Sequence, residues 1–159
     1  AKVQVDFNPE VVSRFRLLGY ENRRVADRDF RNDAVDAGEV GSGHSVTALY
    51  ELKLLPGAEG PLATVNVRYE DPDTGEVTEI ARDFHRDQIS ATFESASPRF
   101  QLDAAVAEYA EILRESFWAL EGDMEGVRAV AGRVSGFLPD DPDVTEFLYL
   151  VTQAALIAG

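Results

Sequence analysis

The sequence predicts an α+β fold, in which a mainly antiparallel, sandwich-like β part comes first and about three α-helices follow. Three observations lead to this prediction. Before residue 96, several short stretches alternate between apolar and polar residues, which is the period of a half-buried strand. After residue 97, apolar residues recur three or four positions apart, which is the period of a helix. Strands and helices do not alternate along the chain, and this argues against a parallel sheet.

We expect the 159 residues to form one domain, with a β-rich part over residues 1–96 and a helical part over residues 97–159. The content of 45% hydrophobic and 28% charged residues is typical of a globular protein. The chain opens directly on a strand-like stretch, without the pattern of a signal peptide. We therefore expect it to be a piece of a longer protein.

The first two extended stretches are residues 2–7 and 12–20. In the first, Val3, Val5 and Phe7 alternate with polar residues, so these three side chains are expected to face the core.

The next strands are predicted over residues 45–55, 63–69 and 77–84. Residues 71–75 read Asp-Pro-Asp-Thr-Gly, which is turn sequence, so the last two of these strands should form a hairpin. Residues 89–94 are expected to add one short strand.

Three helices are predicted after the strands. The apolar residues of the first are Leu102, Val106, Tyr109, Leu113 and Phe117. The second is expected over residues 123–134. Asp141 followed by Pro142 is the signal of a helix start, and it opens the third. The apolar residues of the third helix are Phe147, Leu148, Val151, Ala154 and Ala155.

The net charge excludes some classes of partner. A formal charge of −14 repels phosphate backbones and anionic lipid, so we expect no nucleic-acid partner. No apolar run approaches the roughly 18 residues of a membrane span, so we expect no membrane insertion by this chain. The absence of cysteine removes disulfides and thiolate sites.

No catalytic constellation stands out, and we predict neither an enzyme nor a bound cofactor. His44 and His85 are the only imidazoles, and neither is accompanied by a nucleophile with its own signature. Glu108, Glu111 and Glu115 share one helix face. A di-metal site would need a Glu-x-x-His partner, and no predicted helix contains histidine, so we interpret this face as solvated.

The acidic segment over residues 21–43 supports two interpretations. Asp27, Asp29 and Asp33 offer the oxygen ligands that Ca²⁺ prefers, so the loop from Asp27 to His44 is a candidate Ca²⁺ or small-ligand site. Neighbouring arginines can instead neutralise these carboxylates as surface ion pairs.

The same segment is expected to cover a sheet edge as a structural network. We predict that Arg23 pairs with Asp36 or Glu39, close to His44, because buried polar groups must satisfy one another.

Phe117 and Trp118 are adjacent aromatic residues at the end of the first predicted helix. Aromatic residues at such a position belong to the core or to an interface. We predict that this pair takes part in protein interaction.

One long motif connects the chain to a known family. It comprises residues 17–23, 29–33 and 36–51, which read LLGYENR, DFRND and DAGEVGSGHSVTALYE. This wording resembles the C-terminal region that follows the von Willebrand factor type A domain in bacterial YfbK-type proteins. Residues 100–116 and 143–154 are similar to helices of that region.

The resemblance implies an accessory role. In such proteins the type A domain binds a metal ion through an Asp-x-Ser-x-Ser run, and this chain has no such run. The metal chemistry would therefore belong to the neighbouring domain. The resemblance further implies an exported, envelope-associated parent protein. We expect a non-catalytic interaction domain whose partners are the type A domain of the same polypeptide and an unknown envelope protein.

Overall fold

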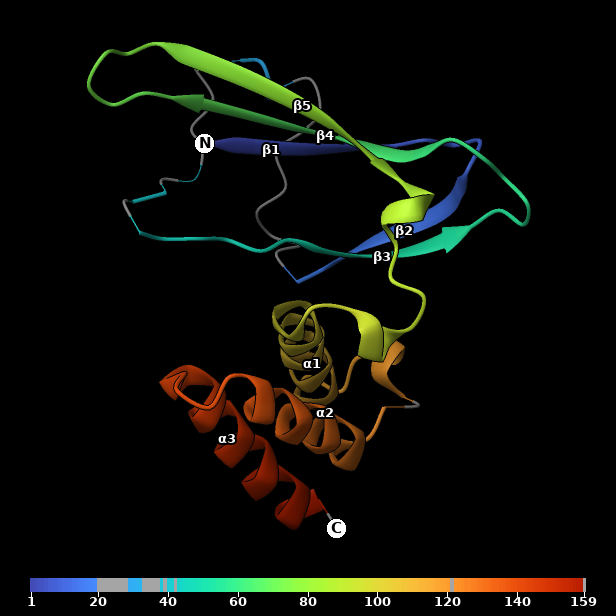
Figure 1. Ribbon diagram of the computed structural model, residues 1–159, viewed down its shortest axis with the longest axis vertical. Coiled ribbons are helices and arrows are strands. Elements are labelled where there is room, and N and C mark those ends of the chain that lie inside the picture. Colours follow the sequence, from blue (N-terminus) through green and yellow to red (C-terminus); the bar gives the residue numbers. More distant parts are fainter. Residues whose placement is uncertain (20–28, 33–37, 39, 42, 121, 159) are drawn as a thin grey trace. The chain divides into compact units, whose positions relative to one another are not determined.

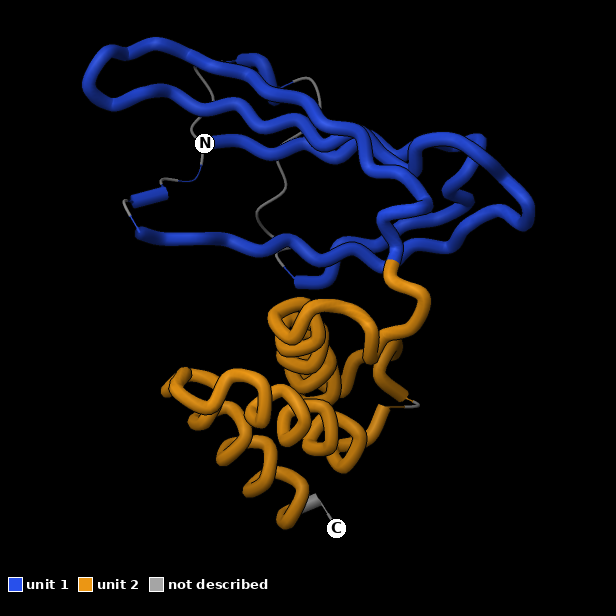
Figure 2. The backbone as a smooth tube through the Cα atoms, viewed as in Figure 1, with its two compact units in different colours: residues 1–89 blue, residues 90–159 orange. Residues whose placement is uncertain are grey.

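The computed structural model describes residues 1–19, 29–32, 38, 40–41, 43–120 and 122–158 of the chain. Its elements are the strands β1 (Lys2–Phe7), β2 (Val12–Leu18), β3 (Leu49–Leu54), β4 (Pro61–Glu70) and β5 (Val77–His85), the helices α1 (Pro98–Leu113), α2 (Met124–Phe137) and α3 (Pro142–Ala158), and the 3₁₀ turns η3 (Arg86–Gln88), η4 (Phe93–Ser95) and η5 (Phe117–Ala119) (Figure 1). The predicted α+β class is confirmed. The chain forms two compact units, residues 1–89 and 90–159 (Figure 2).

The first unit contains two antiparallel sheets, one of three strands in the order β1-β4-β5 and one of the two strands β2 and β3. Figure 1 shows them as two layers of this unit. Their shared core consists of Val11, Val12 and Leu62, against which Phe7, Leu52, Leu54, Ala58 and Phe84 pack. The ring of Phe7 joins the layers, because it stacks on Phe15 at 4.3 Å and meets Tyr50 edge-on at 5.2 Å.

The predicted hairpin is confirmed as β4 and β5. Asp71 Oδ1 accepts hydrogen bonds from the backbone N–H groups of Asp73 at 2.8 Å and Thr74 at 3.0 Å, and Gly75 takes a positive φ of 68°. The backbone donors, Thr74 first, lower the pKa of the Asp71 carboxyl below its usual value.

The first strand buries a residue that the sequence pattern assigned to solvent. Lys2 is 9% exposed, whereas Val3 is 60% exposed, so the prediction that Val3 faces the core was wrong. The reason is a tertiary contact. Lys2 Nζ donates to the carbonyl oxygens of Asn32 at 2.6 Å and Asp29 at 3.3 Å, and these bonds compensate for the burial of its ammonium group.

A row of charged residues crosses the three-stranded sheet and holds segment 29–32. Lys2 lies opposite Arg68, and Arg68 lies opposite Glu79, in the antiparallel register. Arg31 Nη2 donates to Glu79 Oε1 at 2.7 Å, and Arg68 Nη1 lies 3.3 Å from Glu79 Oε2. The hydrogen bond from Arg31 lowers the pKa of the Glu79 carboxyl. The segment is therefore bonded to both edge strands.

Residues 89–94 do not form the expected strand. Thr92 instead caps the 3₁₀ turn η4, because its Oγ1 accepts from the N–H of Ser95 at 3.3 Å while Ser95 Oγ accepts from the N–H of Thr92 at 3.0 Å. These reciprocal hydrogen bonds satisfy the backbone N–H groups of Thr92 and Ser95 within the turn, so these groups need no partner on a neighbouring strand.

In the second unit each helix starts at a side-chain cap. Ser97 Oγ accepts from the N–H of Phe100 at 3.2 Å for α1, and Asp123 Oδ1 accepts from the N–H of Gly126 at 2.5 Å for α2. The predicted start of α3 is confirmed, because Asp141 Oδ1 accepts from the N–H groups of residues 143 and 144 at 3.1 and 3.3 Å.

The core of this unit is centred on α2, which packs against both α1 and α3. Ala105, Val127 and Val151 form one cluster of buried residues, against which Tyr109, Ile112, Val130 and Phe147 pack. Tyr109 and Phe147 meet edge-on with ring centroids 5.8 Å apart. Among the described helices, none combines the length and apolar composition that a membrane span requires.

Gln101 is a buried polar residue that connects α1 to its surroundings. Its Nε2 donates to the carbonyl oxygens of Ala96 at 2.8 Å and Glu94 at 3.1 Å, and its Oε1 accepts from Arg133 Nε of α2 at 3.0 Å. The guanidinium of Arg133 also lies 5.8 Å from the ring centroid of Phe93. One side chain therefore ties η4, α1 and α2 together.

The first prediction concerns this clamp. The substitution Gln101→Leu should lower the free energy of unfolding of the helical unit by about 2–4 kcal/mol, because it leaves two carbonyls and an arginine N–H without their buried partner. Chemical denaturation measures the change. The matched control is Gln153→Leu, an exposed glutamine of α3, which should change stability by less than about 0.5 kcal/mol. Equal effects of the two variants would contradict the role of Gln101.

The second prediction concerns acid. Arg99 Nη1 lies 2.6 Å from Asp141 Oδ2, and this hydrogen bond, together with the backbone donor of Val144, lowers the pKa of Asp141 below its ordinary value of 3.8. A carboxyl with a lowered pKa stabilises the fold above its unfolded pKa, and the stabilisation is lost as the pH falls through the folded pKa. Stability should therefore decrease below about pH 4.

An NMR titration of the Asp141 carboxyl checks this. Arg99→Gln should raise its pKa part of the way to the ordinary value, since the backbone donors remain. The control Arg128→Gln, which removes the ion pair to Glu125 instead, should leave Asp141 unchanged. An unaltered Asp141 pKa in Arg99→Gln would refute the assignment.

Candidate interaction surface

The chain between α1 and α2 forms a tight turn. The N–H of Ser116 donates to the carbonyl of Glu111 and the N–H of Glu115 to that of Ile112, each at 3.0 Å. These two bonds define a Schellman motif, whose left-handed position is normally glycine. Glu115 occupies it here with a φ of 53°. Ser116 then caps η5 by accepting from the N–H of Trp118 at 3.3 Å.

This turn displays three large apolar side chains. Phe117, Trp118 and Leu120 are 74%, 60% and 73% exposed. The rings of Phe117 and Trp118 meet edge-on with centroids 5.5 Å apart, so the pair presents one continuous aromatic surface. We call these three residues the aromatic corner. The structure thus places the predicted pair at the surface rather than in the core.

Acidic side chains lie near the turn, and one of them, Glu111, is buried although the sequence pattern predicts that it is solvated. Glu111 is buried and pairs with Arg114, whose Nη2 lies 2.5 Å from Glu111 Oε1. The prediction that Glu108, Glu111 and Glu115 form one solvated face is therefore wrong for Glu111. The other two are exposed. A side chain at Gly122 would come within 2.9 Å of Glu108 Oε1, so the Glu108 carboxylate lies next to the backbone that leads into α2.

The predicted loop network and the Ca²⁺ hypothesis mostly fall outside the described residues, which do not include Arg23, Asp27, Asp33, Asp36 and Glu39. His44 is exposed, and its backbone N–H donates to the carbonyl of Gly41 at 3.0 Å. Asp29 is half-buried, and its carbonyl accepts from Lys2. Over the described ranges, no group of three or more His, Asp and Glu side chains could hold a metal ion. Both hypotheses stay predictions.

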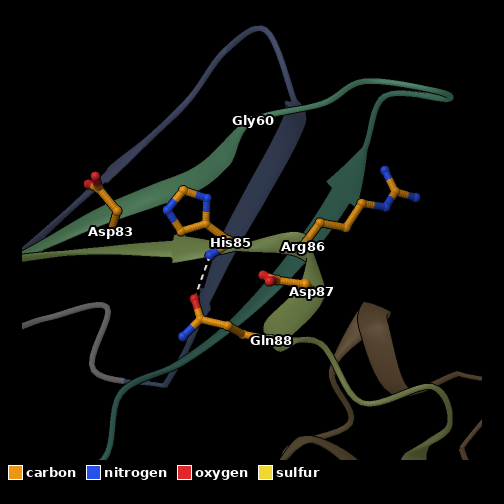
Figure 3. A pocket seen from close by; sticks show the side chains of 6 residues that line it. All are labelled: Gly60, Asp83, His85, Arg86, Asp87 and Gln88. Atoms are coloured by element: carbon orange, nitrogen blue, oxygen red, sulfur yellow. Dashed lines mark hydrogen bonds between the residues drawn. The ribbon is translucent and has the colours of Figure 1, made fainter.

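A shallow hollow lies at the end of β5. It measures about 640 Å³ and is open to solvent, with a lining of Gly60, Asp83, His85, Arg86, Asp87 and Gln88 (Figure 3). Asp83 accepts from Thr64 Oγ1 at 2.6 Å, and the backbone N–H of His85 donates to Gln88 Oε1 at 2.7 Å. These bonds stabilise the strand end and η3. Water screens the charges of so open a site, so it would attract a polar ligand weakly.

The outer face of α3 is a second apolar surface, which the sequence analysis did not single out. Tyr149, Leu150, Leu156 and Ile157 are all exposed. The spacing was visible in the sequence, because Tyr149 and Leu156 are seven residues apart, as are Leu150 and Ile157. The buried residues Val144 and Val151 have the same spacing. A helix with apolar residues on two faces can pack against a neighbouring element on each face.

The comparisons with known proteins agree on one family. The family model described as "Uncharacterized protein YfbK, C-terminal" matches residues 1–61 and 55–157. The chain is 29% identical over 173 residues to "Uncharacterized protein YfbK" of Escherichia coli (strain K12). That alignment covers 96% of this chain but 29% of the relative, so the chain spans less than a third of the relative's length. No solved structure matches.

The third prediction concerns the strained residue of the turn. Glu115→Gly should raise the free energy of unfolding by about 0.5–1 kcal/mol, because glycine adopts a positive φ without the steric cost that a side chain imposes. Thermal or chemical denaturation measures the gain. Glu108→Gly, in the interior of α1, is the matched control and should lower stability by about 1 kcal/mol. A loss of stability in Glu115→Gly would contradict the geometry of the turn.

Proposed function

The chain belongs to the YfbK C-terminal family, and on this basis we propose that it is a non-catalytic protein-interaction domain that accompanies a von Willebrand factor type A domain in one polypeptide. The metal-binding chemistry of such a protein belongs to the type A domain. The present domain binds that neighbour or an envelope partner, and the whole protein works in the bacterial cell envelope.

The aromatic corner carries this proposal. Tryptophan and phenylalanine are enriched at the centres of protein interfaces, where they supply much of the binding energy. In water, an exposed cluster of Phe117, Trp118 and Leu120 leaves its apolar area hydrated, and a partner that covers it gains the hydrophobic free energy. The Schellman motif and the Ser116 cap fix the backbone of this turn, in which all three side chains are exposed.

Two further observations support a companion role. The chain spans 29% of its Escherichia coli relative, so most of that relative lies outside the matching region. The residues that carry the resemblance to the family concentrate in segment 17–51, part of which is bonded across the three-stranded sheet through Lys2 and Glu79. Within that segment, residues 29–32 are thus bonded to two strands of the first unit and stabilise it.

The acidic surface restricts the partner. With 29 acidic against 15 basic side chains, the domain repels other acidic surfaces and attracts a basic rim around an apolar centre. We therefore expect Lys or Arg at the edge of the partner surface that covers the aromatic corner.

The fourth prediction tests the corner. The remaining part of the parent polypeptide, produced as a separate chain, should bind this domain in calorimetry. Phe117→Asp should weaken that binding at least about tenfold, because it puts a charge at the centre of the apolar contact.

The matched control is Phe137→Asp. Phe137 is 62% exposed, and it ends α2, whereas the aromatic corner precedes the start of that helix. The 14 residues of α2 separate the two sites by about 20 Å. The control should bind like the unaltered domain. Equal losses in both variants, or no binding by the unaltered domain, would contradict the proposal. An Asp-x-Ser-x-Ser run upstream in the encoding gene would support it.

A further inference from the structure

The outer face of α3 is a separate surface, made of Tyr149, Leu150, Leu156 and Ile157. Leu156 and Ile157 are 73% and 86% exposed, and Tyr149 is 62% exposed. Tyr149 and Leu156 are seven residues apart, as are Leu150 and Ile157, so the four side chains form two rows along one side of the helix. The opposite side of α3 packs on α2 through Val151 and Phe147.

Both sides of α3 have apolar residues that are spaced seven positions apart. On the inner side Val144 and Val151, again seven residues apart, are fully buried. The partner there is a helix, α2. The outer rows repeat this spacing with residues at least as large, so their geometry also suits a helix that inserts side chains between the rows.

The charges next to the outer rows identify the partner's chemistry. Glu146 lies one turn before Tyr149 and Leu150 on the same side, and Asp143 lies one turn earlier. The sequence of α3 contains no Lys or Arg. The helical unit as a whole has twelve Asp and Glu against four Arg and no Lys, a formal charge of −8.

We infer that the outer face of α3 binds an amphipathic helix whose apolar stripe is flanked by Lys or Arg. A second copy of this chain would bring together two helical units that each have a formal charge of −8, and an anionic lipid surface would also repel this unit, so both are disfavoured. A basic helix places its apolar stripe on Leu156 and Ile157 and its cations near Glu146 and Asp143. This surface is independent of the aromatic corner.

The test uses the full chain and a synthetic probe. The probe is a fluorescent helical peptide of about 18 residues, with Leu at helical spacing and Lys on its flanks. It should bind saturably in fluorescence anisotropy. The same peptide with Glu in place of Lys should bind at least about tenfold more weakly, because its charges repel those of α3.

Two variants locate the site. Leu156→Asp combined with Ile157→Asp should weaken binding of the Lys peptide roughly tenfold or more, since both apolar contacts are replaced by charges. Leu113→Asp, at an exposed apolar position at the end of α1, should leave the affinity unchanged. Circular dichroism verifies that the variants fold.

Glu146→Lys tests the charge alone and keeps the apolar face intact. It should lower the affinity for the Lys peptide about threefold and raise the affinity for the Glu peptide by a similar factor. Because Glu146 is exposed, this variant should fold, and it tests the inference even if the double variant does not fold.

Three results would overturn the inference. Equal affinity of all variants for the Lys peptide would mean that the peptide binds the acidic surface as a whole. A dimer of the unaltered chain that disappears in the double variant would assign the face to a second copy. Binding to vesicles of anionic lipid that the double variant loses would assign it to a membrane.

Discussion

In the helical unit, α2 packs on both α1 and α3, while the two outer helices make few contacts with each other. This arrangement decides which side chains are buried. Each outer helix buries one face, with Ala105 of α1 and Val151 of α3 against Val127 of α2. Apolar residues elsewhere on the outer helices stay in water. The outer face of α3 follows from this arrangement, because α2 covers only the opposite face of that helix.

Local signals in the sequence predicted the elements well. The N-cap Asp141 and the turn at residues 71–75 act through bonds to nearby backbone, so their effect does not depend on the rest of the fold. The failures have a tertiary cause. Lys2 is buried because carbonyl oxygens from a segment distant in sequence accept hydrogen bonds from its ammonium group, and Val3 is exposed as a consequence. Residues 89–94 have strand-like composition, but capping by their own side chains favours a 3₁₀ turn.

The candidate surfaces were only partly predictable. Phe117 and Trp118 attract notice as adjacent aromatic residues, but their exposure depends on the turn that follows α1, where Glu115 takes a conformation that sequence alone would assign to glycine. Periodicity identified the inner face of α3. It did not reveal the outer face, because Leu156 and Ile157 read as core when the number of neighbouring helices is unknown. Burial depends on that number, which is a property of the assembled unit.

Hydroxyl-radical footprinting tests the central claim most directly, because it measures the exposure of individual side chains. The account predicts that Phe117 and Trp118 are oxidised rapidly in the isolated chain and severalfold more slowly within the longer parent polypeptide. Phe137 should react at the same rate in both. Unchanged rates at Phe117 and Trp118 would contradict the claim that the aromatic corner is an interface within the parent protein.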